Sequence, residues 1–213
     1  EEALEGYERA LGMDPTNSTA LAGIARVHEQ RNAWVDASKY WRRVVEAEPD
    51  NAMAWLRLGL DQERCQQYAA AIEALEKATA PEHQTVVAEA RKRIARQALR
   101  AARVAYASEE FEAAGDMIVV AEAIDGPTKP IVGSKKRIVR ALRMMCKESC
   151  ANGQYSVTIA SSRTLRALGD NDAAAWIAVA RAGAAQHEYA VVLDAWKTAQ
   201  SDRPDHPAVL LGI

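Results

Sequence analysis

Apolar and polar positions along the chain recur with the period of an α-helix. Apolar residues return at intervals of three and four, and no long run alternates Val, Ile or Thr with polar residues as a half-buried strand would. Gly and Pro number only 11 and 7 in 213 residues, so few breakers interrupt the helical segments. The pattern predicts an all-α protein.

The helical pattern itself repeats with a period of about 34 residues. A small residue, an aromatic residue four positions later, an apolar residue three positions after that and a closing proline first occur within residues 3–15. The same set returns one period later as Ala37, Trp41, Val44 and Pro49. Near the end of the chain, Trp196, Ala199 and Pro204 repeat the spacing of its last three members, and Tyr189 precedes them.

This helix–turn–helix period resembles the tetratricopeptide repeat (TPR), strongly over residues 1–81 and 173–206 and more weakly between them. The resemblance implies a right-handed α-solenoid of stacked antiparallel helix pairs. Each pair carries two apolar faces that it cannot bury alone, so it must stack on its neighbours. Asn17, Asn51 and either Asn171 or Asp172 are suited to cap the helices that follow them.

The repeat pattern predicts a single TPR-like repeat domain over residues 1–213. Its segments are a half repeat at 1–17, repeats at 18–51 and 52–84, extended repeats at 85–128 and 129–172, a repeat at 173–206 and the start of a further helix at 207–213. In the extended part we expect helices at 82–107, 109–125, 135–151 and 155–168, with a loop at 125–134 because of its Gly and two Pro. A chain that starts and ends within a repeat is expected to be part of a longer polypeptide and to associate head-to-tail through its truncated ends.

Charge is unevenly distributed, although the formal net charge is only −2. Residues 85–150 carry 13 Lys or Arg against 8 Asp or Glu, whereas the segments on either side are net negative. At the centre lies ARKRIARQALRAAR, residues 90–103, with six basic residues and no acid. On a helix, Lys92, Arg93, Arg96, Arg100 and Arg103 fall within an arc of about 100°.

Three interpretations of this basic stripe are open: a solvated face, a nucleic-acid-binding helix or the wall of a groove. Nucleic acid is the least favoured partner, because no aromatic residue that could stack on a base is interleaved with the stripe. The TPR resemblance favours the groove, since it implies that the first helices of the pairs line a concave surface. Transferred to this chain, the inward positions give a groove dominated by arginine, with Arg26, Arg57, Arg96, Arg100, Arg103, Tyr106, Arg140, Arg143, Lys147 and Arg181.

An arginine-rich groove favours an acidic peptide or partner segment, because a guanidinium binds a carboxylate with two parallel hydrogen bonds. Arg96 and Arg100 match in type the basic pair of the TPR carboxylate clamp. Arg26 and Arg57, however, stand where the clamp has Asn, so we do not expect capture of a chaperone tail.

Nothing in the sequence indicates catalysis, a metal or a cofactor. The four His are scattered, and no phosphate-binding loop or nucleophile elbow occurs. Three cysteines cannot all pair, which favours reduced thiols and a cytoplasmic location, and no apolar run reaches the ~20 residues of a membrane span. The sequence thus predicts a non-enzymatic protein–protein interaction scaffold. The alternatives are the non-catalytic TPR region of a larger enzyme such as a glycosyltransferase and, less favoured, a binder of an anionic polymer, RNA or polysaccharide.

Overall fold

The computed structural model describes residues 2–205, and every regular element in that range is helical. The chain forms two compact units, Glu1–Ala95 and Arg96–Ile213, here called unit 1 and unit 2, and the long helix α6 (Gln84–Ala107) runs from one into the other. The further helix predicted to start within 207–213 lies outside the described residues. Each predicted repeat between residues 18 and 202 contains one helix pair, and the description as a single domain stays a prediction.

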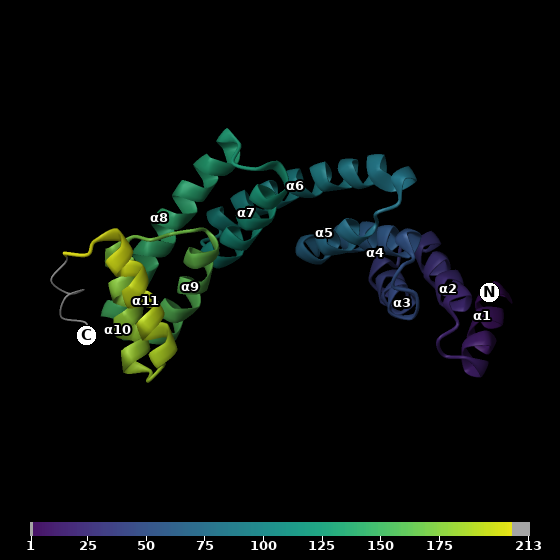
Figure 1. The fold of residues 1–213 in the computed structure, drawn as a ribbon, viewed down its shortest axis with the longest axis horizontal. Coiled ribbons are helices and arrows are strands. Elements are labelled where there is room, and N and C mark those ends of the chain that lie inside the picture. Colours follow the sequence, from purple (N-terminus) through teal and green to yellow (C-terminus); the bar gives the residue numbers. More distant parts are fainter. Residues whose placement is uncertain (1, 206–213) are drawn as a thin grey trace. The chain divides into compact units, whose positions relative to one another are not determined.

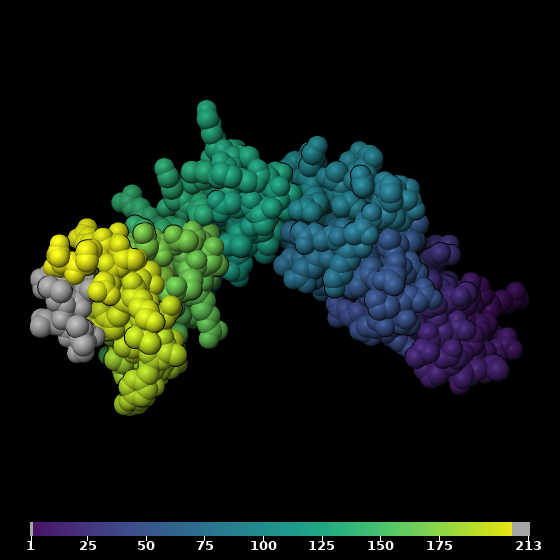
Figure 2. All heavy atoms as spheres, viewed as in Figure 1, coloured from purple at the N-terminus to yellow at the C-terminus, as the bar shows by residue number. Residues whose placement is uncertain are grey.

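In unit 1, α1 packs on α2, and two helix pairs then follow along the chain (Figure 1). Their bounds are α1 Glu2–Met13, α2 Ser18–Gln30, α3 Trp34–Ala47, α4 Ala52–Arg64 and α5 Tyr68–Lys77, and a 3-10 turn at Pro81–His83 precedes α6. In unit 2 the second half of α6 is followed by α7 Phe111–Asp125, α8 Lys129–Ala151, α9 Tyr155–Ala167, α10 Ala173–Ala185 and α11 Tyr189–Asp202. In the space-filling view, the atoms of α8–α11, from green to yellow, adjoin without a gap (Figure 2).

The turn between the two helices of each pair has one geometry throughout. Its second residue has a positive φ of 56° to 73°, and the next residue donates its backbone N–H to a carbonyl five residues back at 2.8 to 2.9 Å. We call the positive-φ residue the turn residue of its pair. The turn residues are Asn32, Gln66, Glu109, Gly153 and His187. The first and last of their spacings along the sequence equal the repeat period, whereas the two middle spacings are longer, so the two middle repeats gain length but keep the same turn.

The first helices of the two middle repeats account for the extra length. Helices α6 and α8 have 24 and 23 residues, against 13 in each of α2, α4 and α10. The predicted loop at 125–134 is wrong, because α8 begins at Lys129. Pro130 occupies the first turn of α8, where its missing N–H would have no intrahelical partner in any case. Gly133 is accommodated inside the helix.

Small residues allow the helices of a pair to approach closely, as the repeat pattern predicts. Ala37 and Ala71 are fully buried. A Cβ added to Gly59 on α4 would lie 2.8 Å from Leu75 Cγ on α5, closer than real Cβ contacts, and 3.1 Å from the Ala71 carbonyl oxygen, which is tighter than most. Between successive pairs, Trp41 packs in the core of unit 1 at 2% exposure.

Side-chain caps start three of the first helices. The side chains of Asn17, Asn51 and Asp172 accept hydrogen bonds from the backbone N–H three residues later, at 2.9 to 3.0 Å. The predicted caps at Asn17 and Asn51 are confirmed, and Asp172 rather than Asn171 caps α10.

Candidate functional site

All ten residues predicted to line a groove lie on the first helices of their pairs. These residues lie on five first helices. The residue six positions before the turn residue is basic in four of the five. We call it position −6, and it is held by Arg26, Arg103, Lys147 and Arg181. All four side chains are exposed. Three of the four belong to unit 2, where they occupy consecutive first helices.

Unit 2 has a pocket between α6 and α8, here called the Arg103 pocket. Its volume is about 360 Å³, and it is lined by Ala102, Arg103, Tyr106, Ser134, Arg137 and Ile138. Ala102 and Ile138 are buried and give the pocket an apolar floor, while Arg103 and Arg137 are exposed. The Ser134 side chain is 4% exposed, and its Oγ has no hydrogen-bond partner among the described residues.

A second pocket of about 360 Å³, here called the Lys147 pocket, lies between α8 and α10. It is lined by Lys147, Cys150, Ala151, Tyr155, Ala174, Ile177, Ala178 and Arg181. Each pocket therefore combines two basic side chains with an apolar floor. The predicted residues Arg103 and Tyr106 come together in one pocket, and Lys147 and Arg181 in the other.

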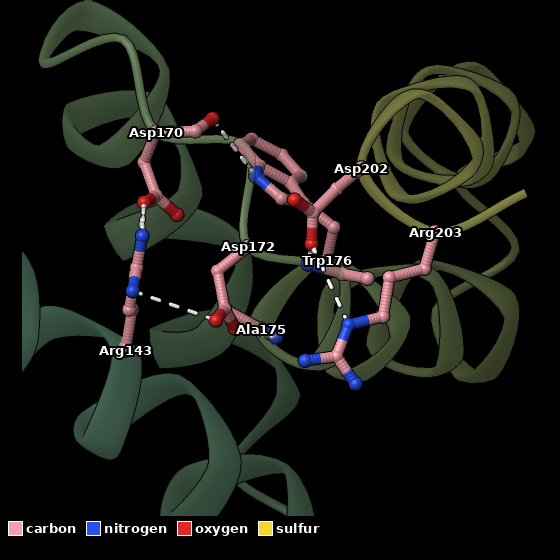
Figure 3. Close-up of polar contacts among 8 residues, drawn as sticks. Arg143, Asp170, Asp172, Ala175, Trp176, Asp202 and Arg203 are labelled. Atoms are coloured by element: carbon pink, nitrogen blue, oxygen red, sulfur yellow. Dashed lines mark hydrogen bonds and ion pairs between the residues drawn. The ribbon is translucent and has the colours of Figure 1, made fainter. Parts of the chain in front are cut away.

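Arg143, also predicted to line the groove, is engaged inside the protein. Its guanidinium binds the Asp170 carboxylate through Nε at 2.8 Å and through Nη2, and its Nη1 lies 3.4 Å from Asp172 Oδ2 (Figure 3). The backbone carbonyl of Asp170 accepts the indole N–H of Trp176 at 3.0 Å, so the cluster joins α8 to the start of α10. Because Asp170 and Asp172 already compensate the Arg143 charge, the arrangement fits a structural role in which Arg143 stabilises the packing of successive repeats.

In unit 1 the predicted groove positions lie among acids. Arg57 Nη1 is 3.4 Å from Glu29 Oε2, and Glu29 also accepts the indole N–H of Trp41 at 2.8 Å. The nearby Asp61 is 1% exposed; burial first, and then the charge of Glu29, raises the pKa of its carboxyl to about 7. Arg26 is exposed. The first helices of unit 1 thus carry charges of both signs.

The first helices of unit 2 differ, because most of their basic side chains have no acidic partner. Within the described residues, no ion pair or side-chain hydrogen bond engages Arg100, Arg103, Arg137, Arg140, Lys147 or Arg181. By contrast, Arg93 on α6 binds Glu63 and Lys135 on α8 binds Glu122, both at distances below 3 Å. Uncompensated positive charge therefore gathers on α6, α8 and α10, although single basic residues without a partner in the described chain also occur on second helices, for example Arg42, Arg163 and Lys197. Arg96, also predicted to line the groove, is exposed, but it takes part in an interaction and is not counted among these uncompensated side chains.

Sequence reasoning identified two of the six residues that line the Arg103 pocket, Arg103 and Tyr106, and missed the polar residues Arg137 and Ser134. Both lie in the first half of α8, Ser134 inside the segment predicted to be a loop and Arg137 three residues after it. The long spacing between Glu109 and Gly153 could have identified an added helical segment there, since about ten extra residues make almost three helical turns.

Metal binding and membrane insertion find no support in residues 2–205. No group of three or more His, Cys, Asp or Glu side chains within that range could hold a metal ion. Nor does that range contain a helix with the length and apolar character needed to cross a bilayer.

Comparison with known proteins points to one repeat family. The family model of the tetratricopeptide repeat matches residues 1–58. No curated protein matches the chain in sequence.

Three solved structures are similar to this chain at low sequence identity. YrrB, described as a TPR protein with an unusual peptide-binding site, is 14% identical over 98% of both chains, with a TM-score of 0.33. The P58(IPK) TPR domain is 10% identical over 97% of this chain and 56% of its own, with a TM-score of 0.40. Pseudomonas aeruginosa pilF is 13% identical over 96% of this chain and 85% of its own, with a TM-score of 0.32.

Proposed function

We propose that this chain, a TPR-type helical-repeat protein, is a protein–protein interaction scaffold that binds an acidic segment of its partner along the first helices of unit 2. The observation that carries the proposal is the set of exposed basic side chains without acidic partners on α6, α8 and α10. Like charges held close together repel each other, and a bound acidic segment would relieve that repulsion.

An acidic peptide fits the pockets better than a nucleic acid does. Both pockets have apolar floors, made of Ala102 and Ile138 in one and of Ile177 and Ala178 in the other. A polyanion backbone has no apolar groups to place there, whereas a peptide offers aliphatic side chains beside its carboxylates. Of the two aromatic residues at the pockets, Tyr106 and Tyr155, neither is among the exposed large apolar side chains on which a base could stack.

The test is direct titration of the chain with a fluorescein-labelled synthetic peptide rich in Glu and Leu, followed by fluorescence anisotropy. The same peptide with Gln in place of every Glu isolates the contribution of charge. We expect the acidic peptide to bind and the Gln peptide to bind at least about tenfold more weakly, since charge-assisted hydrogen bonds contribute more than neutral ones.

Matched charge reversals locate the binding surface. The double variant Arg103→Glu with Lys147→Glu changes both pockets, whereas Arg163→Glu with Lys197→Glu makes the same change in net charge at exposed positions of α9 and α11. Only the first should abolish binding of the acidic peptide. Equal losses in the two variants would refute the groove. Tighter binding of RNA or heparin than of the peptide, with a steep salt dependence, would instead support the anionic-polymer alternative.

A further inference from the structure

We propose that the partner segment is extended and inserts two Glu side chains, one into the Arg103 pocket and one into the Lys147 pocket, separated by about five or six residues. This inference rests on the proposed function and adds to it a rule for the partner's sequence.

The two pockets share a composition, although their second basic residues stand at different positions, Arg137 sixteen residues before Gly153 and Arg181 six residues before His187. In each, the earlier helix contributes the basic residue at position −6, Arg103 or Lys147, together with the residue at position −3, Tyr106 or Cys150. The following helix contributes a second basic residue, Arg137 or Arg181. A ligand that satisfies one pocket therefore has the chemistry to satisfy the next.

The Arg103 pocket fits the side chain of Glu. Its methylene groups would lie on Ala102 and Ile138, and its carboxylate would lie between the guanidinium groups of Arg103 and Arg137. The hydroxyl of Ser134, buried and without a partner in the described part of the chain, supplies a further donor. An unsatisfied buried hydroxyl carries a free-energy cost, so a carboxylate that accepts its hydrogen bond gains more than one at an exposed site.

The separation of the pockets follows from α8, which contributes to both. Arg137 precedes Lys147 by ten residues, or about 15 Å along a helix, and Ser134 precedes Lys147 by thirteen, or about 20 Å. An extended chain advances about 3.3 Å per residue, so about five or six residues cover that distance. A helical segment would need about ten to thirteen residues for the same span.

The stretch of α8 between the two pockets can support the middle of such a segment. Arg140 and Met144 are exposed there, and Met144 is 54% exposed although it is a large apolar residue. An apolar residue midway between the two Glu would cover Met144 and the aliphatic part of Arg140. The inferred recognition sequence is therefore Glu, an apolar residue near the middle and a second Glu.

The experiment uses the full chain and a series of labelled peptides of equal length and composition, in which only the spacing of the two Glu changes. Spacings of about two, about five or six, and about eleven residues are compared by fluorescence anisotropy. We expect the middle spacing to bind at least about tenfold more tightly than the other two. Arg137→Gln should remove that advantage, whereas the control Arg163→Gln should leave it unchanged.

Cys150 gives a second readout without any variant. It lines the Lys147 pocket, whereas Cys146 on the same helix is fully buried and serves as an internal reference. Alkylation of Cys150 by iodoacetamide, followed by mass spectrometry, should slow at least about fivefold when the peptide of middle spacing saturates the chain.

The possible failures are distinguishable. If acidic peptides bind but affinity does not depend on spacing, or if Arg137→Gln behaves like Arg163→Gln, the two-pocket rule is refuted and the basic groove stands. A preference for the long spacing would refute the extended conformation of the segment. If no acidic peptide binds more tightly than its Gln analogue, both this inference and the proposed function are wrong.

Discussion

Replacing Asp61 with Asn tests what the buried acid on α4 costs the folded protein. Asp61 is 1% exposed, and its Oδ2 has no hydrogen-bond partner among the described residues. Burial and the Glu29 carboxylate raise the pKa of Asp61 from 3.8 to about 7, against the opposing charges of Arg64 and Arg57. In the unfolded chain the same carboxyl titrates near its ordinary value.

The direction of the pH dependence follows from these two pKa values. Below about pH 4, Asp61 is protonated in both states and contributes nothing. Between about pH 4 and 7 the unfolded chain has lost the proton that the folded chain retains, so this carboxyl lowers the free energy of unfolding by about 1.4 kcal/mol per pH unit. Above about pH 7 the loss is complete, at roughly 4 kcal/mol.

Asn at position 61 keeps the shape of the side chain and removes the charge. Its amide N–H can donate to Glu29, as the protonated carboxyl does. We therefore expect Asp61→Asn to match the parent chain near pH 4 and to exceed its free energy of unfolding by up to roughly 4 kcal/mol at pH 8. Urea unfolding followed by circular dichroism measures the difference, and hydrogen exchange over Ala52–Arg64 assigns it to α4.

Asp36→Asn is the matched control, because the Asp36 side chain is half exposed and a hydrogen bond from Lys39 lowers its pKa. Its removal should not stabilise the chain at pH 8. The reasoning about Asp61 is refuted if Asp61→Asn destabilises the chain at pH 8, or if its effect is the same at pH 4 and pH 8.

Three further substitutions test packing and the ion-pair cluster of unit 2. Gly115→Ala should destabilise the chain by about 1–3 kcal/mol in thermal unfolding, because the new Cβ would lie 2.2 Å from Thr164 Cγ2. Gly133→Ala, with no atom within 4 Å of the new Cβ, should instead stabilise it by about 0.5–1 kcal/mol, and the reverse order of these two variants would contradict the packing. Arg143→Gln should cost about 3–5 kcal/mol by leaving the buried Asp170 carboxylate unpaired, yet leave acidic-peptide affinity unchanged below the unfolding temperature. A loss of peptide affinity in the folded variant would show that Arg143 contributes to binding and would contradict its assignment as a purely structural residue.

The helix pairs could be predicted because their signals are local. The capping Asn17 and Asn51 and the closing prolines act within a few residues of their own positions, and small residues such as Ala37 and Ala71 mark a contact within a single helix pair. The turn residue could not be predicted in the same way. Asn32, Gln66, Glu109 and His187 adopt a positive φ without being Gly, and the helices on either side impose that conformation.

The start of α8 shows where local signals mislead. Pro and Gly close together usually indicate a loop, yet Pro130 stands in the first turn of a helix, where a proline is favoured. Deciding between the two requires knowing whether the apolar residues that follow find a surface to pack on. Ile131 and Ile138 do, at 2% and 1% exposure, and that tertiary contact is absent from any short window of sequence.

The acidic partners of the arginines could not be predicted from neighbouring residues in the sequence either. Arg57 on α4 meets Glu29 on α2, and Arg143 on α8 meets Asp170 in the turn before α10, in each case across the stacking of successive pairs. In the sequence, Arg57 and Arg143 have the same groove assignment as Arg103 and Lys147. In the structure they differ, because Arg103 and Lys147 have no acidic partner in the described chain. The distinction between a structural and an available arginine depends on what the neighbouring repeat presents.

The lengthened first helices connect the architecture to the proposed binding surface. With 13 residues, as in α4 and α10, α8 would begin near residue 139, and Ser134, Arg137 and Ile138 would not belong to it. Those three residues make half of the Arg103 pocket. The added segment therefore supplies both the second guanidinium and the unsatisfied hydroxyl that distinguish this pocket. A chain whose repeats all had the shorter period would keep the basic residues at position −6 but would lose the anchor that sets the spacing of the partner's acids.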